Sequence, residues 1–215
     1  MKVGTDGVLL GAWAPVEGTR HILDVGTGTG LVALMAAQRC TARVTALEID
    51  AEAAAQAREN VQASPWHDRV QVACANFVGA RFDEPFDAIL CNPPYFIHSL
   101  KSEGEQRTLA RHATSLSCEQ LLAGAASALA PQGSLSVIVP ADQQVLWQQT
   151  APLYGLYPRR LTLVSTTPAS TPKRLLLTLT RDLEICEKGS LTLENGAGGY
   201  SEEFRLLVKD FYLKL

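Results

Sequence analysis

The residues best suited to chemistry lie where an apolar run ends in a rigid polar loop. Residues 87–91 form the run, and Asn92, Pro93, Pro94 and Tyr95 follow it. Neither proline has an N–H, so the Asn92 side chain and the Pro93 carbonyl are acceptors with little local competition. Two acceptors suit a planar amine, and Tyr95 offers a face on which a base would stack with about 1–3 kcal/mol. The alternative interpretation is a turn after a strand that the prolines only stiffen.

A glycine-rich turn of the nucleotide-binding type lies upstream. Gly26, Gly28 and Gly30 follow the predicted strand 21–25, which contains Asp24. Glycines let backbone N–H groups approach a ligand, and the N-terminus of the next helix, predicted over 31–39, favours an anionic group. We predict that Asp24 and the three glycines bind a cofactor. The turn also satisfies the relaxed dinucleotide pattern GxGxxA, so it leaves NAD open beside other adenosine ligands.

Polar residues also end the next two predicted strands. Glu48 lies 18 residues after Gly30, near the end of a strand predicted over 44–49. A nucleotide-binding fold places a carboxylate against the ribose hydroxyls there, although a solvated strand end is the alternative. Asp50 fits better as the N-cap of a helix over 51–63. Asn76 follows a strand over 70–74, and we predict that it contacts the adenine edge.

An alternating α/β framework is needed to bring these residues together, because ligands in open α/β sheets bind outside the carboxyl ends of the strands. A helix capped by Ser117, a strand over 134–139 and a helix over 142–154 continue the alternation. The stretches 161–164 and 174–179 follow with only a turn-rich linker between them, so they should pair antiparallel. Residues 3–13 are glycine-rich and apolar with one carboxylate, as in a segment that passes close under a ligand. The tail, residues 201–215, should dock as an amphipathic helix.

Composition limits the class of protein. A chain of 215 residues suffices for one α/β domain, and a net charge of −3 argues against a strongly basic nucleic-acid clamp while allowing a local patch. No apolar run is long enough to span a bilayer and no secretory signal is recognisable, so we expect a cytoplasmic protein without a membrane partner. The five scattered cysteines lack metal-binding spacing, so we expect no metal, and we expect the cysteines to be small buried hydrophobes.

The whole arrangement resembles the class I S-adenosylmethionine-dependent methyltransferases, and Asn92-Pro93-Pro94-Tyr95 is similar to the signature of members that methylate planar amines. The resemblance implies a Rossmann-like α/β fold with a mostly parallel, seven-stranded sheet of order 3-2-1-4-5-7-6. Strand 7 would be antiparallel, and helices would cover both faces. A narrower resemblance, to the bacterial tRNA(Val) adenine-37 N6-methyltransferase family, covers residues 1–13, the Asn-Pro-Pro-Tyr-Phe loop, 198–203 and 210–215.

Two departures from that family matter. Its members usually carry a further segment before residue 2, so the resemblance leaves open a truncated N-terminus. Asn76 stands where many class I enzymes have Asp, which bears on its predicted adenine contact.

The resemblance implies methyl transfer from S-adenosylmethionine to the N6 of adenine 37 in valine tRNA, without a metal. Asn92 and the Pro93 carbonyl would accept the two N6 hydrogens, and Asn92 would also border the cofactor. Tyr95 would stack on the base. Basic residues beside the loop and in the final hairpin are predicted to contact the RNA: Lys101, Arg107, Arg111, Arg159, Arg160, Lys173 and Arg174.

Four other functions remain open on the sequence. A glutamine methyltransferase of release factors is the nearest, but a protein substrate would not need the basic residues. A guanine N2 methyltransferase of ribosomal RNA often carries a second domain, which this length cannot hold. An NAD oxidoreductase would not explain Asn92 to Tyr95. A non-catalytic RNA-binding protein on the same fold is the fourth. The sequence leaves the oligomeric state open.

Overall fold

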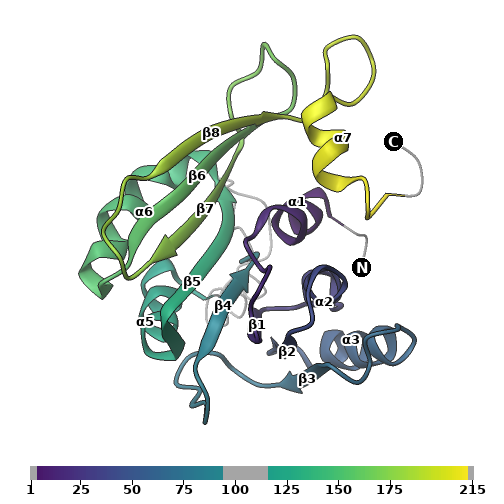
Figure 1. Cartoon of the computed structure of the whole chain (residues 1–215), viewed down its shortest axis with the longest axis vertical. Helices are drawn as coiled ribbons and strands as arrows, with labels where there is room; N and C mark the ends of the chain where they lie inside the picture. The colour runs from purple at the N-terminus through teal and green to yellow at the C-terminus, as the bar shows by residue number, and fades with distance from the viewer. Residues whose placement is uncertain (1–3, 94–115, 213–215) are drawn as a thin grey trace, which may run out of the picture.

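A twisted sheet of eight strands forms the centre of the computed structural model, which describes residues 4–93 and 116–212 (Figure 1). The sheet order is β3-β2-β1-β4-β5-β7-β6-β8. Strands β1 to β5 are parallel, and β7 is antiparallel to both of its neighbours. The expected order and the reversed strand 7 are therefore confirmed. The strands are β1 (His21–Val25), β2 (Arg43–Glu48), β3 (Val70–Cys74), β4 (Phe86–Cys91), β5 (Leu129–Pro140), β6 (Tyr157–Ser165), β7 (Arg174–Thr180) and β8 (Glu187–Thr192).

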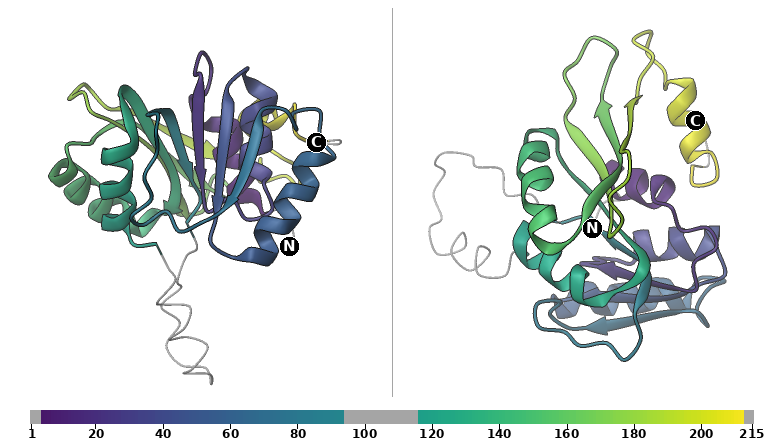
Figure 2. Two further views of the ribbon diagram at one scale, coloured as in Figure 1. Left: turned by 90° about the horizontal axis from the view of Figure 1, so that it is seen from below. Right: turned by 60° about the vertical axis from the view of Figure 1, so that its left-hand side comes forward.

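Helices cover both faces of the sheet, and each face has its own hydrophobic core. One core joins the sheet to α1, α2, α3 and α7, and the other joins it to α5, α6 and a short 3₁₀ helix. Figure 2 shows the strands between these two helical layers. The helices are α1 (Thr5–Trp13), α2 (Leu31–Arg39), α3 (Ala51–Gln62), α5 (Cys118–Ala128), α6 (Gln144–Thr150) and α7 (Glu202–Val208), with 3₁₀ turns at Ala141–Gln143 and Ala151–Tyr154.

The sheet has eight strands, one more than the seven that were expected. Strand β8 pairs parallel with β6 at the edge of the sheet. In this strand only Leu191 is buried. A strand recognised by alternation needs several apolar residues on one face, and β8 offers one. Pairing with a neighbour that is distant in sequence, rather than its own pattern, makes it a strand.

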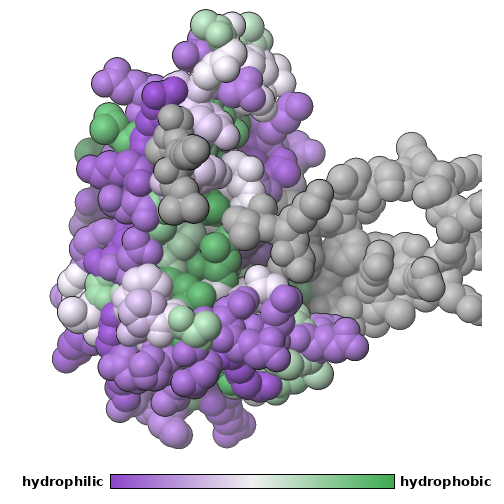
Figure 3. Space-filling view, turned by 90° about the vertical axis from the view of Figure 1, so that its right-hand side faces the viewer, coloured by the Kyte–Doolittle hydropathy of each residue, from purple (hydrophilic) through white to green (hydrophobic). Residues whose placement is uncertain are grey.

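The first segment, for which the sequence predicted no secondary structure, is a helix. Residues Gly7 to Trp13 of α1 are all buried, so the helix has no polar face and no helical period in its hydrophobicity. It packs on α2 and against α7. Gly11 allows the close approach to α2, since a Cβ there would lie 2.7 Å from the Met35 sulfur. Figure 3 shows hydrophobic side chains gathered in the middle of the face that carries these helices, with hydrophilic side chains around them.

Several element boundaries and the state of most cysteines also differ from the expectation, and β6 begins at Tyr157 rather than at 161. Strand β5 begins at Leu129, five residues early, and the helix expected over 142–154 is divided by 3₁₀ turns on both sides of α6. Helix α7 begins at its predicted N-cap, Ser201, whose side chain accepts from the Phe204 N–H, but it ends at Val208 rather than continuing to 215. Of the five cysteines only Cys91 is buried, and Cys74 is exposed.

The parallel register brings the predicted site loops to one edge. Val25 at the end of β1 pairs with Leu47 of β2 and with Cys91 of β4, and Glu48 pairs with Cys74. The loops that follow these paired residues therefore leave the sheet side by side, at the same edge. This is the carboxyl edge at which α/β sheets bind ligands.

Candidate active site

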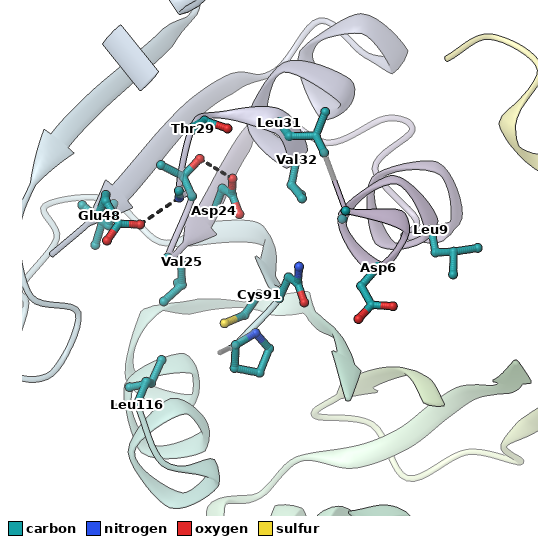
Figure 4. Close-up of a pocket in the computed structure, with 18 of the residues that line it drawn as sticks. Asp6, Leu9, Asp24, Val25, Thr29, Leu31, Val32, Glu48, Cys91 and Leu116 are labelled. Carbon is teal, nitrogen blue, oxygen red and sulfur yellow. Dashed lines mark hydrogen bonds between the residues drawn. The ribbon is translucent and has the colours of Figure 1, made fainter. Parts of the chain in front are cut away.

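A cavity of about 900 Å³ opens at this carboxyl edge. In Figure 4, Glu48 and Asp6 lie on opposite sides of it, with Cys91 between them. The cavity is wide enough for a nucleotide-sized ligand beside a second group. Its lining includes the predicted residues Asp24, Gly26, Gly28, Glu48, Asn76, Asn92, Pro93, Lys173 and Arg174.

The glycine turn has the left-handed backbone that its sequence implies. Gly26, Gly28 and Gly30 have φ of 69°, 59° and 89°. A Cβ on Gly26 would meet no atom within 4 Å, so the left-handed backbone angle, rather than packing, favours glycine there. Gly30 is the N-cap of α2 and is not among the residues that line the cavity. Its predicted direct contact with a cofactor stays a prediction.

Asp24 stabilises the glycine turn by hydrogen bonds to the turn and to the start of α2. Its side chain is 1% exposed, and its Oδ2 accepts from the Thr27 hydroxyl at 2.6 Å and the Ala33 N–H at 3.0 Å. Burial raises the pKa of this carboxyl to about 7, the two hydrogen bonds oppose the shift, and the charge of Glu48 adds to it. A neighbouring cation would therefore favour its ionised form.

Glu48 joins the ends of β1 and β2. Its Oε2 accepts from the Gly28 N–H at 2.8 Å and its Oε1 from the Asp50 N–H at 2.9 Å. These bonds hold the carboxylate in place while leaving lone pairs for two further donors, such as a pair of ribose hydroxyls. The solvated strand end is the wrong interpretation, because the residue is 9% exposed. Asp50 is the N-cap of α3, as predicted.

Asn76 lies in the cavity wall, but part of its side chain is already used. Its Oδ1 accepts from the Val78 N–H at 2.9 Å. The amide Nδ2 is the atom suited to a ligand, so an adenine contact would run from this donor to a ring nitrogen. Ile49, Phe77 and Val78 line the same part and offer apolar surface for a planar ring.

Asn92 and Pro93 follow β4 directly into the cavity, and both are half-buried. Tyr95 and the basic residues Lys101, Arg107 and Arg111 lie outside the described residues, so their predicted roles stay predictions. The neighbouring Cys91 is buried, and burial raises the pKa of its thiol well above the usual range, with Asp24 and Glu48 adding to the effect. This thiol is therefore neutral at physiological pH and is no nucleophile.

The predicted basic cluster of the final hairpin is divided by the strand register. Lys173 and Arg174 line the cavity, whereas Arg160 pairs with Thr178 toward the other end of the hairpin. There Arg160 lies over the Trp13 ring at 4.5 Å, and Arg159 pairs with Glu184 at 3.2 Å. The prediction that all four residues form one patch is therefore wrong.

The sequence did not single out Asp6 and Gly7, which line the cavity from the first turn of α1. The segment was expected to pass close under a ligand. It lines the cavity, and the sequence did not indicate its helical state. Asp6 accepts from Arg174 Nε at 2.8 Å. The one carboxylate in a glycine-rich apolar run was the available signal for this residue.

The site fits S-adenosylmethionine by the chemistry of its donor set. Open space beside positive-φ glycines admits a chain against the backbone, and a fixed carboxylate and an apolar wall suit a ribose and a purine. Within residues 4–93 and 116–212, no group of three or more His, Cys, Asp or Glu could hold a metal ion. None of the helices in those ranges combines the length and the apolar character that crossing a membrane requires.

Comparisons with known proteins agree with this geometry. Residues 5–148 match the family model of the methyltransferase small domain. The chain is 49% identical over 215 residues to the tRNA1(Val) (adenine(37)-N6)-methyltransferase of Phocaeicola vulgatus, covering 100% of this chain and 92% of that protein. It is 43% identical over 217 residues to the enzyme of the same name from Aeromonas hydrophila, with the same coverage.

Among solved structures, a predicted O-methyltransferase from Agrobacterium tumefaciens has a TM-score of 0.70 at 20% identity and covers 95% of this chain and 96% of its own. At that identity the likeness concerns the fold alone. The sequence matches remove the NAD oxidoreductase alternative, since they join the glycine turn and the Asn-Pro-Pro loop in one methyltransferase domain. The chain belongs to the methyltransferase small domain family and, within it, to the tRNA1(Val) (adenine(37)-N6)-methyltransferases.

Proposed function

We propose that this protein transfers a methyl group from S-adenosylmethionine to the exocyclic N6 of adenine 37 in valine tRNA. The observation that carries the proposal is the position of Asn92 and Pro93, which line the same cavity as Glu48 and the glycine turn. An acceptor pair for a planar amine therefore faces the space where a nucleoside cofactor fits. The substrates in the names of the relatives supply the identity of the base.

The bound cofactor supplies an electrophilic methyl group. The protein must prepare the amine, because the N6 lone pair of adenine is conjugated with the ring. The Asn92 Oδ1 and the Pro93 carbonyl would accept the two N6 hydrogens and stabilise the nitrogen as it gains positive character. Such interactions raise turnover because they are stronger in the transition state than in the ground state. The methylated nitrogen loses its proton only after the transfer, so no general base is needed before the attack.

The target base must leave its stack to enter the cavity. A base in an anticodon loop does so at lower cost than a base in a duplex. We propose that Tyr95 stacks on it and that Lys101, Arg107, Arg111 and Lys173 contact nearby phosphates. Local charge rather than the net charge of −3 would then carry the RNA affinity. We also propose that the chain is one domain and acts in the cytoplasm, where its substrate is.

The direct test is methyl transfer from labelled S-adenosylmethionine to bulk tRNA, followed by mass spectrometry of the nucleosides and of fragments of valine tRNA. We expect N6-methyladenine at position 37. Methylation of a release factor with unlabelled tRNA would replace the proposal by the glutamine methyltransferase. Methylated guanine in ribosomal RNA would replace it by the guanine N2 enzyme. Binding of tRNA without any transfer would support the non-catalytic alternative.

A further inference from the structure

The cavity wall contains an ion pair between two distant parts of the chain. Arg174 Nε, at the start of β7, donates to Asp6 Oδ2 on α1 at 2.8 Å, across 168 residues of sequence. The side chains are 33% and 23% exposed, so the pair is partly shielded from water and less screened than a surface pair. Both residues line the cavity, and in Figure 4 Asp6 points into it from α1.

The residue after Asp6 lies close to the predicted amine acceptor. A Cβ on Gly7 would lie 3.9 Å from Asn92 Nδ2 and 3.1 Å from Leu31 Cδ2. The first turn of α1 therefore lies beside the Asn92 amide, in a space that it shares with the Leu31 and Val32 side chains. Protein interiors transmit such contacts because they are densely packed. A shift of this turn would change the orientation of the amide that must face N6.

The other end of α1 is held separately. Trp13 Nε1 donates to Thr162 Oγ1 at 3.2 Å, and Arg160 donates to the Trp13 carbonyl at 3.3 Å. At its beginning, by contrast, the N-cap residue Gly4 makes no side-chain capping bond. Loss of the Asp6–Arg174 pair would therefore loosen the first turn and leave the rest of the helix docked.

Arg174 also differs from its neighbour Lys173. The Lys173 side chain is exposed and has no partner in the described parts of the chain, whereas the Arg174 guanidinium is committed to Asp6 and to the Lys173 carbonyl. A guanidinium held by a carboxylate is a weaker phosphate ligand, because its charge is compensated. The planar fork of arginine suits it instead to a fixed carboxylate contact.

We propose that Arg174 is a positioning residue rather than an RNA ligand. Through Asp6 it holds the first turn of α1 against Asn92 and so keeps the acceptor amide oriented for the target amine. This inference rests on the proposed methyl transfer to adenine. It revises the prediction from the sequence that Arg174 contacts the RNA, and it leaves Lys173 in that role.

The test is a double-mutant cycle with Asp6→Asn, Arg174→Gln and the combination. Misplacement of a catalytic group by about 1 Å costs up to about 10²-fold in rate, so we expect each single variant to lower kcat on tRNA by roughly 10- to 100-fold. The kcat of the double variant should be no lower than that of the less active single variant, since both substitutions break the same interaction. The KM for tRNA, the slope of log affinity against log salt and the affinity for S-adenosylhomocysteine should stay close to those of the wild type.

A readout without RNA completes the test. Amide hydrogen exchange of residues 5–10 should become faster in both single variants, while exchange of the other end of α1 stays as in the wild type. Glu184→Gln is the matched control, because it breaks the exposed Arg159–Glu184 pair at 3.2 Å far from the cavity. It should change neither kcat nor exchange in α1.

Two results would overturn the inference. An unchanged kcat in Asp6→Asn together with a smaller salt slope in Arg174→Gln would make Arg174 a phosphate ligand. Unchanged exchange of residues 5–10 in both variants would mean that the pair does not hold the turn. If instead the wild-type protein transfers no methyl group to tRNA, the proposed function fails, whereas hydrogen exchange still tests the pair by itself.

Discussion

The two sides of the cavity are built over very different distances along the chain. On the predicted cofactor side, Asp24, Gly28 and Glu48 come from the ends of β1 and β2, and their hydrogen bonds span 2 to 20 residues. On the opposite side, Asp6 and Arg174 meet across 168 residues, and the far end of α1 is held by the bond between Trp13 and Thr162 across 149. The first side follows from local motifs on a parallel sheet. The second exists only when the reversed strand β7 and the edge strands fold back onto α1.

Asn92 lies where the two sides meet, so its substitution should have the largest effect. Removing one preorganised electrostatic partner costs about 10²–10³ in rate. We expect Asn92→Ala to lose kcat on tRNA by that factor, with affinity for S-adenosylhomocysteine nearly unchanged. Single-turnover methylation and calorimetry would measure the two quantities. A rate near that of the wild type would contradict the catalytic role of Asn92 and favour the alternative interpretation, in which the prolines only stiffen a turn.

Glu48 should report on the cofactor side alone. Hydrogen bonds to a charged group contribute about 1.5–3 kcal/mol, which corresponds to roughly 10- to 100-fold in affinity. Glu48→Ala should weaken S-adenosylhomocysteine binding in calorimetry by that amount while leaving tRNA affinity unchanged. Glu52→Gln, an exposed carboxylate in the first turn of α3, is the control and should bind normally. Equal affinity of Glu48→Ala and the wild type, with an intact fold, would remove Glu48 from the site.

Asp24 should make the stability of the cofactor side depend on pH. With a pKa near 7 in the folded state and an ordinary value of 3.8, the folded chain binds more protons than the unfolded chain between about pH 4 and pH 7. The free energy of unfolding contributed by Asp24 therefore falls as pH rises, by up to about 1.4 kcal/mol per pH unit. We expect the free energy of unfolding of Asp24→Asn, measured in urea, to rise relative to that of the wild type as pH increases over this range.

Other titrating groups contribute equally to both proteins and cancel in that difference. A constant difference between Asp24→Asn and the wild type from about pH 5 to pH 7 would mean that Asp24 ionises at its ordinary pKa. Because its proton is lost near neutrality, the affinity for a cationic ligand at this carboxyl should also rise with pH.

Lys173 should give the smallest effect, on the RNA side. Each phosphate contact contributes roughly −0.7 to −0.9 to the slope of log affinity against log salt. Lys173→Ala should reduce the magnitude of that slope for tRNA by about this amount without changing kcat at saturating tRNA. Lys188→Ala, on the exposed edge strand β8, is the matched control. Equal slopes for the two variants would place Lys173 outside the RNA contact.

The cofactor side was predictable because its signals are local. The strands His21–Val25 and Val70–Cys74, the helix Leu31–Arg39 and the N-cap at Asp50 have the predicted bounds or role. Each has a pattern readable within a few residues: an apolar run, a glycine turn or a capping side chain. The position of Glu48 at the cavity could be predicted because parallel pairing brings every strand end to the same edge.

The sequence by itself determined the alternation of strands and helices, the glycine turn, the place of Glu48 at a strand end and the Asn-Pro loop after β4, and the family resemblance supplied the order of the strands in the sheet. The tertiary structure alone decided that residues 5–13 form a helix, that 187–192 form a strand and that Arg174 pairs with Asp6 rather than standing beside Arg159 and Arg160. The physical reason is that a helix buried on all sides beyond its first turn and an edge strand with one buried residue have no periodic pattern of their own. An ion pair across 168 residues depends on strand register, which only the assembled sheet defines.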